Sequence, residues 1–329
     1  NLYLFDKDYD QPFTHQARVQ FEREVFANTT FSVQYTLFRG RDLSRTRNAN
    51  LAAPVATSFP IFTAGGVDTG QTATFLRFSN PRPIPAYQRI SLFESTAKSL
   101  YHGLTFEFNR RLANRWQFNT NYTFSNARDN KPDQTSVVPG VDDAKIAENN
   151  FDLSGEDARS DLNVRHRFVF SPVYETGTMN KVSNKVLRAI LSDYVITGIF
   201  TAQSGFAYSA IVSGDPNGDG NFASDRAPGT RRNEFTTPSV YIFDMRVGRM
   251  IRIGERARVT LFGEGFNLFN RSNRQTVNNT FYSFSSSGGG RLTQTTNFAT
   301  PRTFVSGSPS FTFNSSFNRE FQLGIRLDF

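Results

Sequence analysis

The sequence predicts an all-β fold, an antiparallel up-and-down transmembrane β-barrel of which this chain supplies the C-terminal part. Three observations lead to this prediction. Apolar and polar residues alternate with a period of two in nine separate segments, which gives each strand one apolar and one polar face. The connections between these segments are short and long in turn, the plan of barrels with short periplasmic turns and long extracellular loops. No apolar run reaches about 18 residues, so a membrane would be crossed by strands and not by a helix.

The composition fits strands that are apolar on one face and hydrated on the other. Phe supplies 35 of the 329 residues and aromatic residues 14%, yet the mean hydropathy is −0.45. Cysteine is absent, which excludes disulfides and cysteine-based metal sites. The net charge of +8 raises the question of nucleic acid. Because the arginines are spread along the chain and form no single stripe, we expect no nucleic-acid partner.

The alternation runs from the first predicted strand to the last. The nine segments are Ala17–Val25, Phe31–Leu37, Leu104–Phe108, Trp116–Phe124, Val164–Phe170, Ile196–Ala202, Tyr241–Val247, Val259–Leu261 and Phe321–Phe329. With their flanks they give strands of about 9 to 14 residues, close to what a tilted strand needs to cross a bilayer. The alternation blurs near Gly263–Phe266, and a bulge is expected there because Gly inside a strand often marks one.

The connections predict which end of each strand faces outward. Short links lie at Ala27–Asn28, Ala113–Arg115 and Gly254–Glu255, a medium link lies near Gly177–Asn184, and long polar links span residues 40–99, 127–160, 213–238 and 271–316. If the last strand descends to the periplasm, strict alternation places the short links there and the long ones outside. This count requires Arg89–Phe93 to be an extra β piece within the first long loop and not a spanning strand.

The final segment carries the clearest alternation. Its apolar positions are Phe321, Leu323, Ile325, Leu327 and Phe329. An apolar residue at every second position before a terminal Phe resembles the signal that is read by the outer-membrane assembly machinery. We therefore expect this machinery and outer-membrane lipid to be partners of the chain.

Several longer stretches resemble TonB-dependent receptors. Residues 257–273, ARVTLFGEGFNLFNRSN, resemble the penultimate strand of that family with its FNLFN core. Residues 101–129, 161–175, 198–209 and 214–229 resemble the Oar-like subgroup, which carries an N-terminal carboxypeptidase-regulatory-like domain before plug and barrel. The resemblance implies a barrel of about 22 strands. Residues 1–329 would then be an incomplete C-terminal portion of it, without plug or N-terminal domain.

The resemblance also implies a function, energy-coupled uptake of a bulky nutrient of the siderophore, glycan or peptide class. The TonB complex would act through the missing plug, and an unknown extracellular ligand would bind the loops. Two alternatives are open: a surface protein on the same barrel that acts in adhesion, secretion or surface assembly, and a soluble carbohydrate-binding β-sandwich. An enzyme is not expected, because the three histidines lie far apart and neither HExxH nor GxSxG occurs. No cofactor is required.

Two loops carry candidate binding residues, and each has a second interpretation. The first loop is acidic and could recognise a cationic or metal-bearing ligand, or could simply be charged for solubility. Its candidates are Asp129, Asp133, Asp142, Asp143, Glu148 and Asp152. The second loop places oxygen-bearing side chains at alternate positions and a Gly in sixth place, as at the start of a calcium loop. Its candidates are Asp215, Asn217, Asp219, Asn221 and Asp225. Arg226 stands where the bidentate Glu of such a loop belongs, and the other interpretation is a solvated Asp/Gly turn.

Charged residues on the polar faces of the strands are expected to line a lumen and to pair there. The cations are Arg165, Arg167, Arg246 and Arg326, and the anions are Glu107, Asp244, Glu264 and Asp328. The aromatic residues of the opposite face are expected to form an exposed belt about 25 Å tall.

Overall fold

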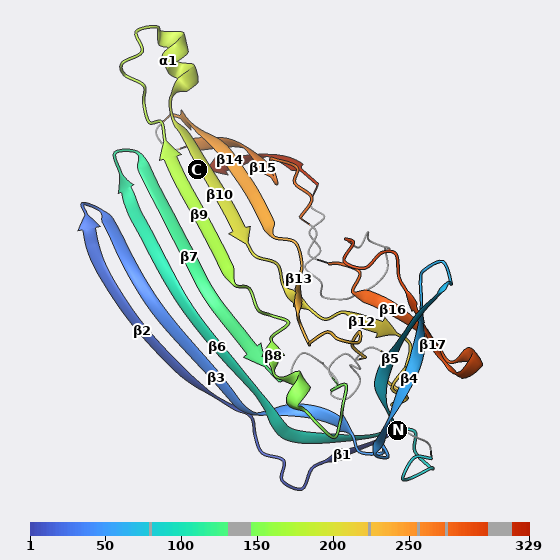
Figure 1. The fold of residues 1–329 in the computed structure, drawn as a ribbon. Helices are drawn as coiled ribbons and strands as arrows, with labels where there is room; N and C mark the ends of the chain where they lie inside the picture. Colours follow the sequence, from blue (N-terminus) through green and yellow to red (C-terminus); the bar gives the residue numbers. More distant parts are fainter. Residues whose placement is uncertain (79–80, 131–145, 223–224, 255–256, 274–275, 302–317) are drawn as a thin grey trace.

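The main feature of the computed structural model is one curved, twisted sheet of long antiparallel strands (Figure 1). The structure describes residues 1–78, 81–130, 146–222, 225–254, 257–273, 276–301 and 318–329. The long strands are β2 (Phe13–Phe26), β3 (Thr29–Asn48), β6 (Ile90–Ala113), β7 (Trp116–Asp129), β9 (His166–Glu175), β10 (Tyr194–Gln203), β14 (Val240–Ile253), β15 (Ala257–Phe266) and β18 (Glu320–Asp328). They neighbour one another in chain order, and each of the nine predicted segments overlaps one of them, with Val164 lying before β9 and Phe329 after β18. Within the described residues the sheet does not close, and β2 and β18 are its edges.

The strand register places the apolar positions of all nine strands on one face, called the apolar face below. Val19 lies opposite Tyr35, Tyr35 opposite Leu104, and Leu104 opposite Phe124. The other strands add Phe168, Phe200, Phe243, Leu261 and Ile325 to the same face. Val19 is 71% exposed and Leu323 is 88% exposed, so no second layer covers these ends of the face in the part of the chain that is described. The expectation of an exposed aromatic and aliphatic face is confirmed, and the β-sandwich alternative is wrong because it required a covering sheet.

Two strands are longer than predicted. β3 has 20 residues and β6 has 24, and they remain paired beyond the other strands, with Thr46 opposite Phe93. The expected extra β piece at Arg89–Phe93 is not a separate element: Ile90–Phe93 is the beginning of β6 and pairs in parallel with β1 (Leu2–Phe5). The prediction that Arg89–Phe93 is not a separate spanning strand is therefore right. The prediction that it is an isolated β piece within a loop is wrong, because it continues directly into β6.

The bulge expected at Gly263–Phe266 is absent. β15 keeps one continuous register with β14 up to Gly265 and with β18 up to Phe266. The glycines instead make room for neighbouring side chains. A Cβ at Gly265 would collide with Leu268, and a Cβ at Gly324 would collide with the ring of Phe262. The alternation looked blurred because glycines occupy positions on the apolar face.

The short connections all lie at one end of the sheet, as predicted (Figure 1). Asn114 and Arg115 join β6 to β7 with φ angles of 52° and 71°, the positive values that a tight type I′ hairpin turn requires. The medium connection between β9 and β10 contains the helix α1 (Lys185–Leu191), whose first turn is capped by the side chain of Asn184. None of the helices that the structure describes is long and apolar enough to span a membrane.

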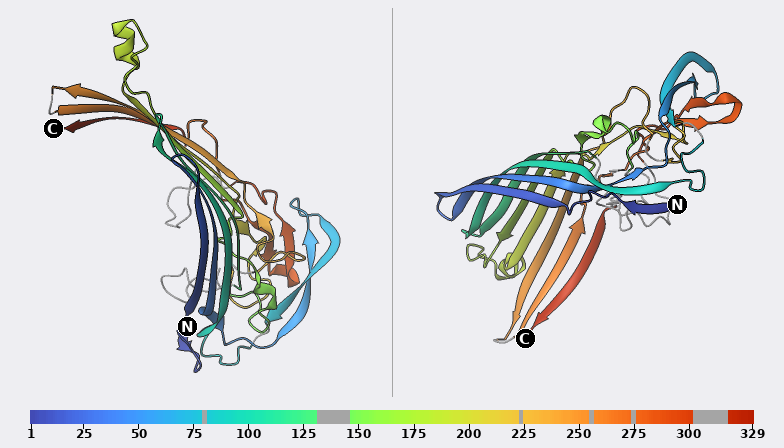
Figure 2. Two further views of the ribbon diagram at one scale, coloured as in Figure 1. Left: turned by 90° about the vertical axis from the view of Figure 1, so that its left-hand side faces the viewer. Right: turned by 90° about the horizontal axis from the view of Figure 1, so that it is seen from below.

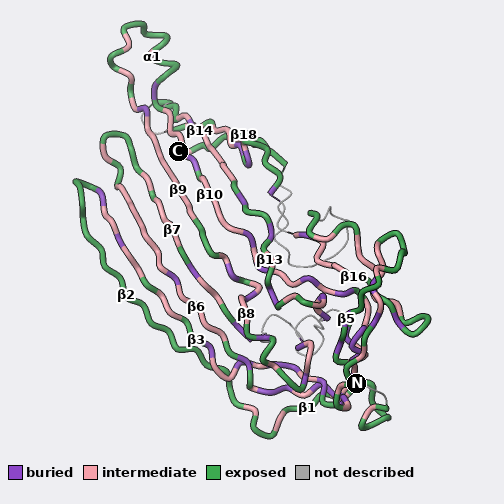
Figure 3. Tube along the Cα trace, in the orientation of Figure 1, coloured by how far each residue is buried: buried purple, intermediate pink, exposed green. Residues whose placement is uncertain are grey.

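The long connections are folded and not plain polar loops. They form a second sheet from β4 (Pro54–Phe62), β5 (Asp68–Phe78), β12 (Ile211–Ser213), β16 (Thr280–Ser285) and β17 (Arg291–Gln294). A hydrophobic core lies in this sheet, formed by Phe59, Ile61, Ala73, Phe75, Val212 and Leu292. A short pair, β11 (Ala207–Tyr208) with β13 (Phe235–Thr236), lies nearby. Figure 3 shows buried residues gathered at this loop end, whereas the long strands contain few.

Candidate ligand-binding face at the loop end of the sheet

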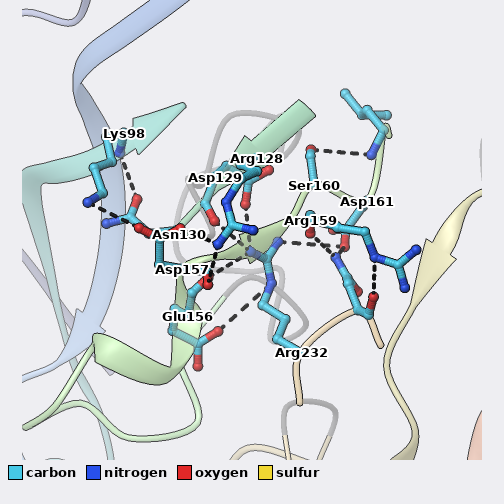
Figure 4. Close-up of polar contacts among 12 residues, drawn as sticks. Lys98, Arg128, Asp129, Asn130, Glu156, Asp157, Arg159, Ser160, Asp161 and Arg232 are labelled. Atoms are coloured by element: carbon cyan, nitrogen blue, oxygen red, sulfur yellow. Dashed lines mark hydrogen bonds and ion pairs between the residues drawn. The ribbon is translucent and has the colours of Figure 1, made fainter. Parts of the chain in front are cut away.

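A buried arginine joins the end of β7 to two loops (Figure 4). Arg232 Nη1 lies 2.7 Å from Asp129 Oδ1, and it donates to the backbone oxygens of Asp129 at 3.1 Å and Glu156 at 2.9 Å. The side chains of Arg232 and Glu156 are 4% and 1% exposed. Charges are buried in proteins when they are paired and hydrogen-bonded. The pairing therefore fixes the loop around residue 232 against β7.

A second arginine continues this cluster. Arg226 Nη1 lies 2.9 Å from Glu156 Oε1, and Arg226 Nη2 lies 2.5 Å from Glu148 Oε2. The backbone N–H of Arg226 also donates to Glu148, at 2.9 Å. Glu156 ends the short 3-10 helix η2 (Ser154–Glu156), so both arginines hold this turn of the acidic loop. We call Asp129, Glu148, Glu156, Arg226 and Arg232 the buried ion cluster.

A more exposed group of charges lies beside the buried ion cluster. Asp157 Oδ2 lies 3.2 Å from Lys98 Nζ, and Asp157 Oδ1 lies 3.0 Å from Arg128 Nη2. Burial acts to raise the pKa of Asp157, but the hydrogen bonds from Arg128 and Lys98 outweigh it and hold the pKa below its usual value. One carboxylate thus serves two cations on neighbouring strands.

A third arginine connects β8 (Ala158–Arg159) to the loop before β14. Arg159 Nε donates to the backbone oxygen of Asn233 at 2.9 Å, and Nη1 donates to Thr236 Oγ1 at 3.1 Å. Asn233 Nδ2 donates in turn to Asp161 Oδ1 at 2.6 Å. These bonds make the loop end one polar, tightly connected assembly that could present a shaped surface to a ligand.

The acidic loop predicted from the sequence is used for this internal pairing. Asp129 and Glu148 belong to the buried ion cluster, where Arg232 and Arg226 already balance their charge. Asp152 is exposed, and its side chain accepts from the backbone N–H of Ser154 at 2.9 Å. Three further candidates, Asp133, Asp142 and Asp143, lie outside the described residues. A site for a cationic ligand built on Asp129 and Glu148 is not supported by this geometry.

The calcium-like loop folds as a series of side-chain turns. The N–H of Asp219 is donated to Asp215 Oδ1 at 3.1 Å and to Asn217 Oδ1 at 2.9 Å. The N–H of Gly220 is donated to Asp215 Oδ2 at 3.0 Å, and that of Asn221 to Asp219 Oδ1 at 2.6 Å. Four of the predicted residues, Asp215, Asn217, Asp219 and Asn221, are therefore brought together, with these four side-chain oxygens accepting from the loop's own backbone.

The surroundings of this loop do not favour a cation. Asp225 is buried, and Arg226 in the twelfth position pairs with carboxylates outside the loop. Arg89 Nη2 donates to the backbone oxygen of Gly220 at 3.1 Å. Burial raises the pKa of Asp219 to about 7. Among the residues described, no group of three or more His, Cys, Asp or Glu is placed to hold a metal ion. Calcium binding stays a prediction.

The opposite side of the sheet, called the polar face below, carries the expected ion pairs in part. Arg246 Nη1 lies 3.2 Å from Glu264 Oε1, and the Arg246 guanidinium lies 3.9 Å from the centre of the Phe262 ring. Arg326 Nε lies 2.9 Å from Asp328 Oδ1 within the same strand. The polar face thus carries charged side chains along the strands, which suits a water-filled interior.

The final strand lies at the edge of the sheet with its apolar side chains uncovered. Phe321, Ile325 and Leu327 are exposed on the apolar face, and β18 pairs along its whole length with β15. Phe329 follows the strand and is exposed. This geometry suits an edge strand that pairs with another strand, and its role as an assembly signal stays a prediction.

The sequence indicated none of the basic partners in the buried ion cluster. Arg226 and Arg232 lie in loops, where charges are ordinarily interpreted as solvated. Arg232 is 103 residues from Asp129 in the sequence, and no local pattern connects them. The only available signal was that two arginines follow an Asp/Gly-rich loop next to an acid-rich one.

The match to a protein family agrees with this architecture. Residues 1–230 match a family described as outer membrane beta barrel domain. The outer membrane transporter YddB from Escherichia coli matches at 8% identity and a TM-score of 0.49, over 98% of this chain and 33% of that one. The FrpB iron transporter from Neisseria meningitidis matches at 11% identity and a TM-score of 0.45, over 98% of this chain and 32% of that one. The chain spans about a third of the length of these two proteins. No curated protein matches it.

Proposed function

The chain belongs to the outer-membrane β-barrel family, and we propose that it forms part of the wall and outer loops of a TonB-dependent transporter for a bulky nutrient. Its location is the outer membrane. There the apolar face meets lipid and the polar face lines the lumen. The short turns then lie in the periplasm and the folded loop end lies outside the cell.

The observation that carries the proposal is the open sheet. About eight strands already suffice to close a small barrel, yet in the described part of the chain these nine strands leave β2 and β18 apart as two free edges (Figure 2). Unpaired strand edges are costly in lipid, because their N–H and C=O groups find no partners there. Further strands must therefore complete a wide barrel. Barrels of porin width enclose an open aqueous channel, whereas the still wider barrels of outer-membrane transporters are plugged, and a TonB-dependent transporter is of the plugged kind.

The loop end supports a role in ligand capture. The buried ion cluster and the five-stranded loop sheet hold the outer connections in one arrangement before any ligand arrives, which lowers the entropy lost on binding. In the proposed transport cycle the ligand binds these loops and the plug, and force from the TonB complex then opens a path along the polar face. The barrel contributes walls and binding surface and no chemistry.

A second function is favoured by one feature, the five-stranded loop sheet with its own hydrophobic core. A folded module of this kind outside the membrane suits a surface protein of the Oar-like type that acts in adhesion, secretion or surface assembly. In that case the loop sheet, and not the lumen, would carry the activity.

The test uses the full-length protein. We expect it to bind the purified periplasmic domain of TonB, and we expect cells that express it to take up one member of a panel of ferric siderophores, oligosaccharides and oligopeptides. Uptake should stop when the proton gradient is collapsed. No TonB binding and no energy-dependent uptake, together with a surface phenotype that survives the uncoupler, would refute transport in favour of the surface role.

A further inference from the structure

The apolar face ends in a band of cations at the extracellular end of the sheet. The register that places Leu37 and Leu100 on this face continues outward to Arg39, which lies opposite Leu100. Leu100 in turn lies opposite Arg128 on β7. Side chains alternate between faces along a strand, so these arginines point in the same direction as the leucines. They are the next positions outward after the lipid-facing residues.

These cations line a groove. A cavity of about 530 Å³ lies over β3, β6 and β7 at this position. The side of the groove nearer the middle of the long strands is formed by Leu37, Leu100 and His102. Its outer side is formed by Arg39, Arg41, Lys98, Arg128 and Asp157. The groove therefore has an apolar side that continues the lipid-facing surface and a charged side beyond it.

The groove carries an excess of positive charge. Asp157 is shared between Lys98 and Arg128. Arg39 and Arg41 have no carboxylate partner in the described part of the chain, and Arg39 is exposed. The remaining carboxylate at the groove, Asp129, is paired with Arg232 in the buried ion cluster. Four cations thus face one shared carboxylate.

We propose that this groove binds the phosphate-bearing headgroup of a lipid in the outer leaflet. Guanidinium groups recognise phosphate through paired N–H donors, and Arg39 and Arg41 offer two such groups at headgroup level. The acyl chains of the same molecule would lie along Leu37 and Leu100 and the apolar residues below. A soluble anion would gain only the charged half of this site. The proposal depends on the orientation of the barrel given above and is independent of transport.

The test measures lipid retention by the purified full-length protein, using native mass spectrometry after detergent exchange. The probes are a diphosphorylated glycolipid of the lipid A type, the same lipid without its phosphates, and inorganic phosphate. We expect wild-type protein to retain the diphosphorylated lipid, and Arg39→Gln/Arg41→Gln to bind it at least tenfold more weakly. Removing the lipid phosphates should weaken binding to wild-type protein by a similar factor and should hardly affect the variant.

The matched control removes two arginines from the polar face. Arg18→Gln/Arg167→Gln changes the net charge equally but should retain the lipid as wild type does. Heat-dependent mobility in detergent gels checks that each variant keeps its barrel. Equal binding by both double variants would overturn the proposal. So would complete displacement of the lipid by millimolar inorganic phosphate, because it would show that the groove takes a free anion and not a lipid.

Discussion

The buried ion cluster makes a quantitative prediction about the loop end. Arg232→Met keeps most of the side-chain volume but leaves Asp129 and Glu156 without this cation. The Arg232 and Asp129 side chains are only 4% and 9% exposed, so water cannot replace the lost partner easily. Removing one member of a buried pair costs about 3–5 kcal/mol. At 1.4 kcal/mol per factor of ten, opening of these loops should become roughly a hundred to a few thousand times more frequent.

Amide hydrogen exchange on the full-length protein measures this opening directly. We expect faster exchange in the described residues around 146–165 and 225–239, with β9, β10 and β14 unchanged. Lys98→Gln is the matched control at the same end of the sheet. Its pair with Asp157 is 52% and 44% exposed, and exposed pairs contribute at most about 1 kcal/mol. The control should therefore accelerate exchange less than about tenfold.

A double variant tests whether unpaired charge is the cause. Arg232→Met combined with Asp129→Asn removes one of the carboxylates left without its cation. We expect amide exchange in these loops to be at least ten times slower in this double variant than in Arg232→Met alone. If Arg232→Met exchanges no faster than Lys98→Gln, the arginine does not hold the loops, and a preorganised outer face would lose its main support.

Four further outcomes are expected. Asp157→Asn should lower the melting temperature slightly at pH 7, and this difference should shrink as the pH falls below 3.8, because a depressed carboxyl pKa adds stability above its usual value and loses it as the pH falls through the folded value. Ile325→Arg should cost about 2–4 kcal/mol in lipid, whereas Gln322→Arg on the polar face should cost little; equal effects in refolding titrations would contradict the assigned faces. Asn184→Ala should cost about 1 kcal/mol of local stability in α1, seen as faster amide exchange there. Calcium at about 10 mM should leave the melting temperatures of wild type and Asp215→Ala unchanged, because the loop's oxygens already accept from its own backbone; a rise in wild type that Asp215→Ala abolishes would establish a calcium site.

The sequence was informative wherever structure depends on near neighbours. Period-two alternation identified all nine long strands, because each strand by itself has apolar residues at every second position. Tight turns such as Asn114–Arg115 were found for the same reason. The bulge at Gly263–Phe266 was predicted wrongly because a glycine that makes room for a neighbouring side chain looks the same in sequence as a glycine that kinks a strand.

The loop end could not be predicted because its contacts join distant segments. β17 pairs with β4, and Leu292 lies opposite Ile61. Neither β12, with three residues, nor β17, with four, is long enough to show a period of its own. The same separation hid the partner of Asp129. Composition indicated that charges were abundant in these loops, but only the fold decides which of them are buried.

The arginines at the extracellular end are divided between two environments, and this division connects ligand capture to the membrane. Arg232 and Arg226 are enclosed, and each has carboxylates within reach because an unpaired buried charge would destabilise the fold. Arg39 and Arg41 lie at the boundary of the lipid, where solvent and headgroups can satisfy them and no carboxylate partner is needed. The first pair therefore fixes the shape of the outer loops, while the second forms part of the charged side of the groove. Since β7 carries both Arg128 of the groove and Asp129 of the buried ion cluster, a lipid bound in the groove would steady a strand to which the outer loops are tied.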